Sequence, residues 1–587
     1  MTLGIVQAWV SRFAMNPDGI SYLDIGDGFW RGDFQTLLNG YWSPLYGFLL
    51  GLALKILKPS PYWEFPVVHL VNFLIYLLAL LSFDFFLREF IKARQQDRDE
   101  ALPVYLWLTI GYLLFISSSL LMITLGVVSP DMLIAACIYL AAALLLRIRG
   151  NPQQKADYIF LGLVLGIGYV SKTVMFPLAF VILSVSFILA PGPQSFVFWL
   201  SRLVFHPLSF GEGRGEGLSP SSFAPSPNPS QREGKETTRQ ANRSSLLAVI
   251  VFLAIAAPLI LALSLLKGRP TFGDSGKLNY VWEVNRIPKY IHWQGEPATS
   301  GVPKHPTRKI FDQPAAYEFA TPLSGSYPPW FDPSYWHEGV RPTFNFRRQF
   351  AVFNRWSLTC AKGFVGLCGG LFTVVFLLLA INRRGWSPRK MASSSWFILL
   401  IAIVPMLMYS LVFVSLRYIA PFEVLLWLSL FSGLPGWPES RRRWDNVAVW
   451  LGFLFMFSVQ TPMPMMETAR SLLYRTPDPQ PTQWQIANGL NQMGMQPGEK
   501  VASIGDALYA QWYRLARVQV VAEVPGGPDV IETFWKAEPA VREQVLERLA
   551  KAGARAVVID SAPRDEKMDG WQRIADTDAS VYFLRER

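Results

Sequence analysis

Charged side chains are scarce in this chain of 587 residues. Asp, Glu, Lys and Arg make up 17% of it, whereas hydrophobic residues make up 51% and aromatic residues 14%. Soluble globular proteins carry about 25% charged residues, and the mean hydropathy of this chain is positive, at +0.25. The shortage of charge excludes an ordinary soluble enzyme, and it also excludes a disordered or collagen-like chain.

Cysteine is also rare, with three residues in the whole chain. Cys137 lies in an apolar run, while Cys360 and Cys368 lie eight residues apart near the start of an expected helix. Two positions so far apart along one helix cannot form a disulfide bond. The sequence therefore predicts no disulfide framework.

Long apolar runs, by contrast, are abundant. A helix that spans a bilayer needs about 20 mostly apolar residues, and the sequence predicts ten such spans: 65–90, 102–123, 130–148, 157–173, 175–192, 245–266, 362–381, 396–416, 418–434 and 446–461. The expected fold is a polytopic α-helical membrane protein of about ten to eleven spans.

The net charge of +11 does not indicate a nucleic-acid partner, because that function needs basic residues gathered on one soluble face. Here the basic residues lie in short loops beside the spans, as the positive-inside rule expects for cytoplasmic loops. With ten spans, the strongly basic loops fall on one side. Segments 1–64 and 267–360 and the tail from about 465 then face outward; for a bacterial inner membrane, this side is the periplasm.

The expected organisation follows from this topology. It comprises a first outward loop (1–64), spans (65–205), a disordered cytoplasmic insertion (206–244), a span (245–266), a periplasmic aromatic loop (267–360), further spans (361–461) and a periplasmic α/β domain (465–587). The segment 42–58 is apolar but short, and it is predicted to be a juxtamembrane helix. Because a segment that begins outside needs a preceding span, we expect a first span to be missing before residue 1.

The tail has the pattern of a small α/β domain. Strands are expected at 501–505, 518–524 and 556–560, a helix at 541–552 and a closing hairpin at 571–585. Alternation of strands with a helix in about 110 residues is typical of such a domain.

Four charged residues lie on the outward side of the predicted topology: Asp18 in the first outward loop, Asp131 at the outer start of a span, and Lys172 and Arg417 in two outward turns. A charge at membrane depth costs roughly 2.5–3.5 kcal/mol on insertion scales, so these residues are candidates for function. Purely structural roles also fit their positions. Asp131 would suit the dipole at a helix N-terminus, the two cations could extend to lipid headgroups, and Asp18-Gly19 could form a turn.

The motifs around these residues resemble a family of integral-membrane enzymes. They are the Pro-Asp-x-x-x-Tyr pattern that contains Asp18 and Tyr22, a Ser-Pro-Leu-Tyr segment at 43–46, the Pro-Asp pair at Asp131, the break at Lys172, and the Arg417-Tyr418-x-x-Pro pattern. Together they look like glycosyltransferases of the GT-C class, above all the bacterial relatives of protein O-mannosyltransferases and of the lipid A aminoarabinose transferase. The resemblance covers about 18–435.

The resemblance implies a function for each motif. Asp18 would be the catalytic carboxylate, with Asp131 holding the acceptor, the donor or a metal ion. Lys172 and Arg417, with Tyr22 and Tyr418 beside them, would bind the phosphate of the donor. The donor would be a polyprenyl-phosphate sugar, and the acceptor a lipid, a glycan or a protein.

Two positions depart from the family pattern. Ser43-Pro44 stands where the aminoarabinose transferase has Lys-Pro, so one phosphate contact is absent or replaced. Gly19 stands where relatives commonly carry Glu, and Asp24 and Asp27 are candidates to supply the second acid.

The chemistry that the resemblance implies is coherent. Cations would stabilise the departing phosphate, a carboxylate would accept the proton of the acceptor hydroxyl, and in-line displacement would invert the anomeric centre. No spacing matches a standard zinc site, and the histidines of the aromatic loop define no metal site. A divalent metal ion remains an open alternative as cofactor.

Two other functions compete with a glycosyltransferase. A transporter or flippase of lipid-linked glycans would show an internal repeat of spans, which the sequence lacks. A non-catalytic glycan-assembly subunit of the membrane would keep the fold without turnover. The aromatic residues of 267–360 could stack on sugars, or they could pack the loop and form an interface belt.

Overall fold

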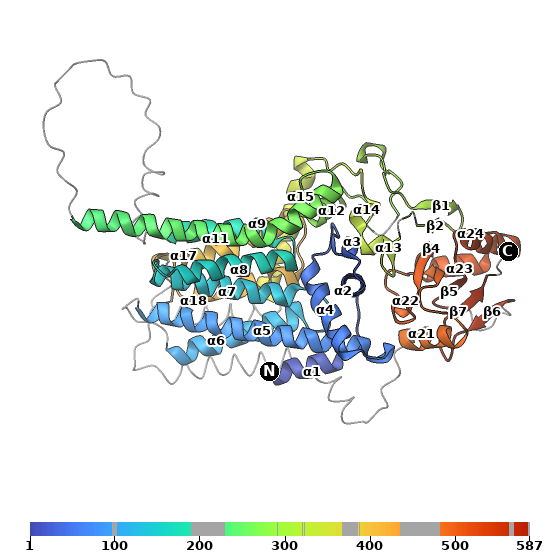
Figure 1. The fold of residues 1–587 in the computed structure, drawn as a ribbon, viewed down its shortest axis with the longest axis horizontal. Helices are drawn as coiled ribbons and strands as arrows, with labels where there is room; N and C mark the ends of the chain where they lie inside the picture. The colour runs from blue at the N-terminus through green and yellow to red at the C-terminus, as the bar shows by residue number, and fades with distance from the viewer. Residues whose placement is uncertain are drawn as a thin grey trace, which may run out of the picture.

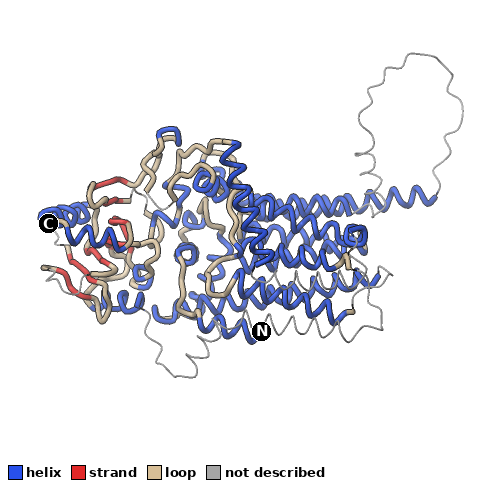
Figure 2. The backbone as a smooth tube through the Cα atoms, turned by 180° about the vertical axis from the view of Figure 1, so that it is seen from behind, coloured by secondary structure: helices blue, strands red, loops and turns tan. Residues whose placement is uncertain are grey.

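The computed structural model describes residues 1–96, 103–189, 229–289, 292–319, 321, 323–366, 386, 388–434, 482–562 and 569–584. Along the longest axis of the molecule, a bundle of long helices is followed by a layer of short helices and loops, and then by a small α/β domain that contains the C-terminus (Figure 1). Seen from behind, the strands gather at the end of the molecule opposite the bundle (Figure 2).

The bundle contains the long helices. They are α5 (Pro61–Gln96), α6 (Val104–Ile116) with a π-helical continuation (Ser117–Ile123), α7 (Asp131–Gly150), α8 (Lys155–Ser171), α9 (Met175–Leu189), α11 (Pro229–Lys267), α15 (Phe346–Gly366), α17 (Pro388–Ser410) and α18 (Leu416–Phe431). Four helices of the described ranges are long and apolar enough to cross a membrane, at Pro61–Gln95, Val104–Ile123, Asp131–Gly150 and Asn242–Lys267.

Eight of the ten predicted spans coincide with these helices. Of the other two, 362–381 is described only for its first residues, which end α15. The span predicted at 446–461 lies outside the described residues. The number of spans therefore stays a prediction, whereas the helical membrane-type architecture is observed.

Helix α7 occupies the centre of the bundle. It packs against α5, α8, α9 and α18, and nearly all of its residues are buried. Small residues such as Ala135, Ala136 and Ala142 allow neighbouring backbones to approach closely. By contrast, only 22% of the most apolar window of α11 is buried, so this helix lies at the edge of the bundle, where its apolar surface would face lipid.

Helix α11 begins earlier than the sequence led us to expect. It starts at Pro229, inside the segment 206–244 that was assigned to a disordered insertion, so 229–244 is helical. Residues 206–228 lie outside the described residues.

The middle layer carries the short helices. They are α1 (Thr2–Val10), α2 (Pro17–Trp30), α3 (Phe34–Leu37), α4 (Pro44–Leu57), α12 (Ser275–Glu283), α13 (Pro328–Phe331) and α14 (Pro333–Trp336). Helix α4 is the predicted juxtamembrane helix. It crosses α2 at glycines: a Cβ on Gly26 would lie 2.6 Å from the carbonyl oxygen of Gly47. Only glycine permits this approach, which fixes α2 against α4.

The C-terminal domain is a mixed sheet with helices. Its elements are α21 (Thr482–Gln492), β3 (Lys500–Gly505), α22 (Trp512–Leu515), β4 (Gln519–Pro525), α23 (Pro528–Lys536), α24 (Pro539–Lys551), β5 (Ala556–Ile559), β6 (Trp571–Arg573) and β7 (Ser580–Phe583). Strands β4, β3 and β5 are parallel, and β7 and β6 continue the sheet antiparallel. The strands, the helix and the hairpin predicted for the tail are all present.

Two strands of the sheet come from the aromatic loop rather than from the tail. Strands β1 (Arg308–Phe311) and β2 (Ala316–Glu318) form a hairpin, and β2 pairs with β4 through the register Glu318 to Ala522. The full order is β1-β2-β4-β3-β5-β7-β6. The loop and the tail domain therefore form one continuous sheet, which the sequence did not indicate because both strands are very short.

Candidate functional site

Asp18 lies in the first turn of α2, where Pro17 starts the helix. A carboxylate in this position is favoured by the helix dipole. Its Oδ2 accepts a hydrogen bond from Nη2 of Arg417 at 3.0 Å, and its Oδ1 accepts one from Nε1 of Trp330 at 3.3 Å. The side chain keeps 21% of its surface exposed, so Asp18 can still meet a ligand.

Asp131 is the first residue of α7 and is almost completely buried, with 2% of its side chain exposed. Its Oδ1 accepts from Nζ of Lys172 at 2.5 Å, and its Oδ2 accepts from Oγ of Ser129 at 2.9 Å. Lys172 reaches it from the C-terminal end of α8, where the chain breaks before α9 begins. The break predicted at Lys172 is therefore what brings this cation to Asp131.

Arg417 lies between the two carboxylates. In the first turn of α18, its Nη2 binds Asp18, while its Nε lies 3.4 Å from Oδ2 of Asp131. The hydroxyl of Tyr418 accepts a hydrogen bond from Arg417 at 3.4 Å, and Nζ of Lys172 lies 3.6 Å from the centre of the Tyr418 ring. Five of the six predicted site residues thus form one cluster at a single end of the bundle.

Tyr22, the sixth, lies behind the cluster. One turn after Asp18 on α2, it is 3% exposed and packs edge-on against Trp42 and Tyr46. It is absent from the cavity wall described below. Tyr22 therefore packs α2 against Trp42 and Tyr46. Its contact with the substrate stays a prediction.

A cavity of about 500 Å³ opens beside the cluster. Its walls are formed by Asp18, Tyr41, Trp42, Met122, Ile123, Thr124, Val127, Asn279, Lys289, Trp330, Phe413, Ser415, Leu416, Arg417 and Tyr418. Asp18 lies on this wall, whereas Asp131 and Lys172 do not. The volume falls in the range of about 300–1,000 Å³ that small-molecule sites occupy.

Lys289 and Trp330 line this cavity, and the sequence did not single them out. Trp330 belongs to the aromatic loop, but nothing in the pattern distinguished it from the other tryptophans. Nζ of Lys289 lies 5.3 Å from the ring centre of Trp282 and 5.6 Å from that of Phe413. Burial lowers the pKa of Lys289, Arg417 acts in the same direction, and Asp18 opposes them.

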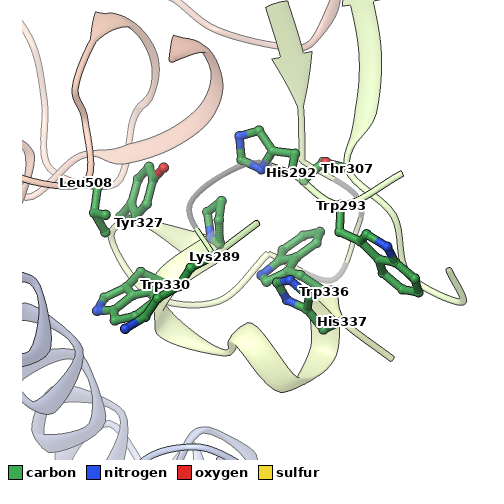
Figure 3. Close-up of a pocket in the computed structure, with 10 residues that line it drawn as sticks. Lys289, His292, Trp293, Thr307, Tyr327, Trp330, Trp336, His337 and Leu508 are labelled. Atoms are coloured by element: carbon green, nitrogen blue, oxygen red, sulfur yellow. The ribbon is translucent and has the colours of Figure 1, made fainter. Parts of the chain in front are cut away.

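A second, smaller cavity of about 40 Å³ adjoins the first, because Lys289 and Trp330 line both (Figure 3). It has room for water and none for a sugar. At its edge, Tyr327 donates to Oε1 of Glu523 at 2.9 Å, and Nε2 of His292 lies 2.5 Å from the same carboxylate. Burial and the Glu523 carboxylate raise the pKa of Tyr327 well above its usual value, so the hydroxyl stays protonated.

The tryptophans of the aromatic loop are core residues. Trp282, Trp293, Trp330 and Trp336 are between 4% and 8% exposed. Of the two interpretations that the sequence left open, packing of the loop fits them better than free stacking platforms. Tyr290 lies outside the described residues.

Asp24 and Asp27 do not provide a second acid beside Asp18. Both carboxylates bind Nη1 of Arg514, at 2.8 and 2.6 Å. Neither residue lies on the wall of the cavity described above, and the hypothesis that they compensate for Gly19 stays a prediction.

A divalent metal ion does not fit the carboxylates of the cluster. Asp18 and Asp131 are both paired with cations, and the described ranges contain no group of three or more His, Cys, Asp or Glu residues placed to hold a metal ion. We therefore derive no step through a metal ion.

Comparisons with known proteins give weak likenesses in structure alone. No protein-family model and no curated protein sequence matches the chain. Among solved structures, ArnT from Cupriavidus metallidurans in the apo state matches with 13% identity and a TM-score of 0.48, over 99% of this chain and 97% of that one. The same protein bound to undecaprenyl phosphate matches with 11% identity and a TM-score of 0.45, over 99% and 96%.

The Archaeoglobus fulgidus oligosaccharyltransferase, tethered to an acceptor peptide, matches with 13% identity and a TM-score of 0.43, over 95% of this chain and 68% of that one. Both proteins are GT-C glycosyltransferases, the class that the sequence motifs resemble.

Proposed function

We propose that the chain transfers a sugar from a polyprenyl-phosphate donor to a lipid, glycan or protein acceptor at the periplasmic face of a bacterial inner membrane. The observation that carries the proposal is the position of Arg417. It lies between Asp18 and Asp131 on the wall of a cavity of about 500 Å³, at one end of an apolar helix bundle. The sequence motifs that resemble GT-C enzymes supply these same residues.

The cations of the site suit a phosphate leaving group. Lys172, Arg417 and Lys289 face two carboxylates, so the cluster carries one net positive charge when all five groups are ionised. Preorganised positive charge stabilises the negative charge that develops on a departing phosphate. The family pattern has a lysine where this chain has Ser43. Lys289 supplies a lysine to the cavity from a different segment and could replace it.

Asp18 is the better placed of the two carboxylates to act as general base. It lines the cavity and is partly exposed, whereas Asp131 is buried and saturated by Lys172, Ser129 and Arg417. The acceptor oxygen would bond to the anomeric carbon as the bond from that carbon to the phosphate oxygen breaks. The electron pair leaves with the polyprenyl phosphate and the proton goes to Asp18. Attack opposite the leaving group inverts the anomeric centre.

The cavity wall also suits the lipid part of the donor. Met122, Ile123, Val127, Phe413 and Leu416 give part of the wall an apolar surface. Each belongs to a bundle helix or to a connection between bundle helices. A prenyl chain could therefore extend from the phosphate toward the bilayer.

The position of the basic loops supports a site on the periplasmic side of the membrane. Helix α7 has Asp131 at its first turn and Arg147 and Arg149 at its last, so the site lies at the end opposite that basic loop. If the basic loops face the cytoplasm, the cavity and the C-terminal domain face the periplasm.

The test uses purified full-length protein with a panel of polyprenyl-phosphate sugars and measures sugar release or transfer. We expect turnover with at least one donor, and we expect Asp18→Asn to abolish it while the variant remains in the membrane. Asp312→Asn removes a carboxylate that is 92% exposed and far from the cluster in sequence, and it serves as the matched control. Full activity in Asp18→Asn would contradict the proposal. Donor binding without turnover in the wild type would favour a non-catalytic assembly subunit, and translocation of the intact lipid would favour a flippase.

A further inference from the structure

Arg514 of the tail domain reaches into the middle layer and is buried there among three carboxylates. On α22, it is 3% exposed. Its Nη1 donates to Asp24 at 2.8 Å and to Asp27 at 2.6 Å, and its Nε donates to Oε1 of Glu64 at 2.8 Å. Arg517 adds a second cation, which binds Glu64 and lies 3.8 Å from Asp27. One guanidinium therefore joins the tail domain to α2 and α5.

Two of the three carboxylates belong to the helix that carries Asp18. Asp24 and Asp27 are three residues apart on α2, so they lie on one face of the helix. Asp18 precedes Asp24 by six residues, about 9 Å along the helix axis at 1.5 Å per residue. If α2 is rigid, contacts at Asp24 and Asp27 fix its rotation about the helix axis and its position along that axis. They therefore also fix the position of Asp18.

A second connection runs from Asp24 to the other partner of Asp18. The carboxylate of Asp24 accepts from the backbone N–H of Ser326 and from its hydroxyl, both at 2.6 Å. Ser326 precedes α13, and Trp330 on α13 donates to Asp18. The group that Arg514 holds thus also fixes the segment that orients the Asp18 carboxylate.

The guanidinium is suited to this task in a way that a lysine is not. Its planar fork can bind several carboxylates at once, whereas an ammonium group is a point charge on a flexible stem. Asp24 depends on it for compensation, whereas Asp27 and Glu64 also contact Arg517. Compensation matters because an unpaired buried charge is strongly unfavourable.

From these contacts we infer that Arg514 is a positioning residue for Asp18, and that the tail domain is thereby part of the catalytic unit. The inference rests on the proposed function, in which Asp18 is the base. Arg514 lies outside the cavity wall, as do Asp24, Asp27 and Glu64, so it acts through α2 and not on the substrate. Its loss should affect the rate of the chemical step and leave donor binding by Arg417 and Lys289, which line the cavity, in place.

The experiment compares Arg514→Lys with Arg147→Lys in the full-length protein. Arg147 also binds a buried aspartate, Asp157, at 2.9 Å, but at the other end of α7, so it is the matched control. We expect Arg514→Lys to lower kcat at least about tenfold, since a misplacement of about 1 Å can cost roughly 100-fold. The donor KM should stay within about twofold of the wild-type value, because the residues that bind the donor are unchanged. Arg147→Lys should change neither.

Hydrogen–deuterium exchange of α2 provides a readout that does not depend on turnover. In Arg514→Lys, the backbone amides of α2 that follow Pro17 should exchange faster than in the wild type, while those of α7 should not. If Arg514→Lys fails to fold, Asp27→Asn weakens the same contact at a carboxylate that is 28% exposed and should shift both readouts in the same direction.

Unchanged exchange in α2, or a rise in donor KM at constant kcat, would overturn the inference. The proposed function fails separately, if the wild type transfers no sugar from any donor. In that case exchange in α2 still decides whether Arg514 fixes the helix.

Discussion

Arg417 donates a hydrogen bond from Nη2 to Oδ2 of Asp18 at 3.0 Å, although 399 residues separate the two in the chain. The same side chain faces the buried Asp131 with its Nε, 3.4 Å from Oδ2. The arginine therefore contacts two carboxylates and also lines the cavity. Because a phosphate in the cavity would share Arg417 with Asp18, binding of the donor would loosen the hold on the carboxylate that we propose as base.

Arg417→Lys tests whether the fork of the side chain is needed. A lysine keeps the charge but cannot bridge two carboxylates in the way a guanidinium does. We expect kcat/KM to fall roughly 10- to 100-fold, equivalent to about 1.4–2.7 kcal/mol of transition-state stabilisation. Steady-state transfer kinetics measure it. Arg355→Lys, at an arginine that is 55% exposed and binds Glu283, is the control, and equal kinetics in the two variants would contradict the role of Arg417.

Trp330→Phe removes the hydrogen bond to Asp18 and keeps an aromatic ring that can stack on Trp282, whose ring centre lies 6.2 Å away. A hydrogen bond to a charged group contributes about 1.5–3 kcal/mol. We expect kcat to fall about tenfold or more, with donor KM little changed. Trp293→Phe also removes an indole donor from the loop, one that binds the backbone of Glu296. That control should retain wild-type kcat, and a similar loss in both variants would point to a general effect on the loop.

The pH dependence of donor binding should reveal Lys289. Its pKa is lowered by burial, so it loses its proton at a lower pH than a free lysine, which titrates near 10.4. The positive charge that attracts the phosphate is present below this lowered pKa and is lost as the pH rises through it. As the pH is raised, donor KM should therefore begin to increase at a lower pH than it would if Lys289 had the pKa of a free lysine. Measurement of KM against pH tests this expectation.

Lys289→Arg separates this effect from other alkaline transitions. Arginine stays protonated at any accessible pH, so the alkaline increase in KM should disappear in the variant. Lys304→Arg, at a lysine that is 66% exposed, should leave the wild-type profile unchanged. An alkaline increase that persists in Lys289→Arg would exclude Lys289 as its source.

The stability of the protein should fall in mild acid because of His337. Burial lowers its pKa to about 4. The neutral ring is satisfied on both sides, by the carbonyl of Pro333 at Nδ1 and the indole of Trp282 at Nε2. The unfolded chain binds a proton below about 6.5, so the contribution is complete above that pH and is lost as the pH falls to about 4.

The expected loss is about 3 kcal/mol, since each pH unit corresponds to about 1.4 kcal/mol. The thermal midpoint between pH 7 and pH 4 measures it. His337→Gln cannot ionise and should show a smaller fall in midpoint across this range, although it starts from a lower value at pH 7. An identical pH dependence in the variant and the wild type would rule out His337 as the cause.

Much of the architecture can be read from local patterns. Apolar runs of about 20 residues predicted the bundle helices, because a span must be apolar along its whole length whatever lies beside it. Alternating short strands and a helix predicted the tail domain. The charged candidates were found for the same local reason: Asp18, Asp131, Lys172 and Arg417 all stand at helix ends, where Pro, Ser or a break marks the boundary.

Other features depend on contacts between distant segments and leave no local signal. Lys289 looks like any loop lysine until packing places it beside Asp18 and Arg417, and β1 and β2 are too short to be recognised without β4. Asp24 and Asp27 were candidates for a second acid, and nothing in the sequence indicated that both bind Arg514, 490 residues from Asp24.

The sequence by itself thus determined the helical membrane architecture, the small C-terminal sheet domain and the four charged residues that meet at one end of the bundle. The tertiary structure alone decided which carboxylate faces the cavity, which lysine and tryptophan join it, and how the tail domain holds α2. The physical reason is that hydrophobic periodicity and helix boundaries are properties of neighbouring residues, whereas the pairing of buried charges depends on which helices pack together.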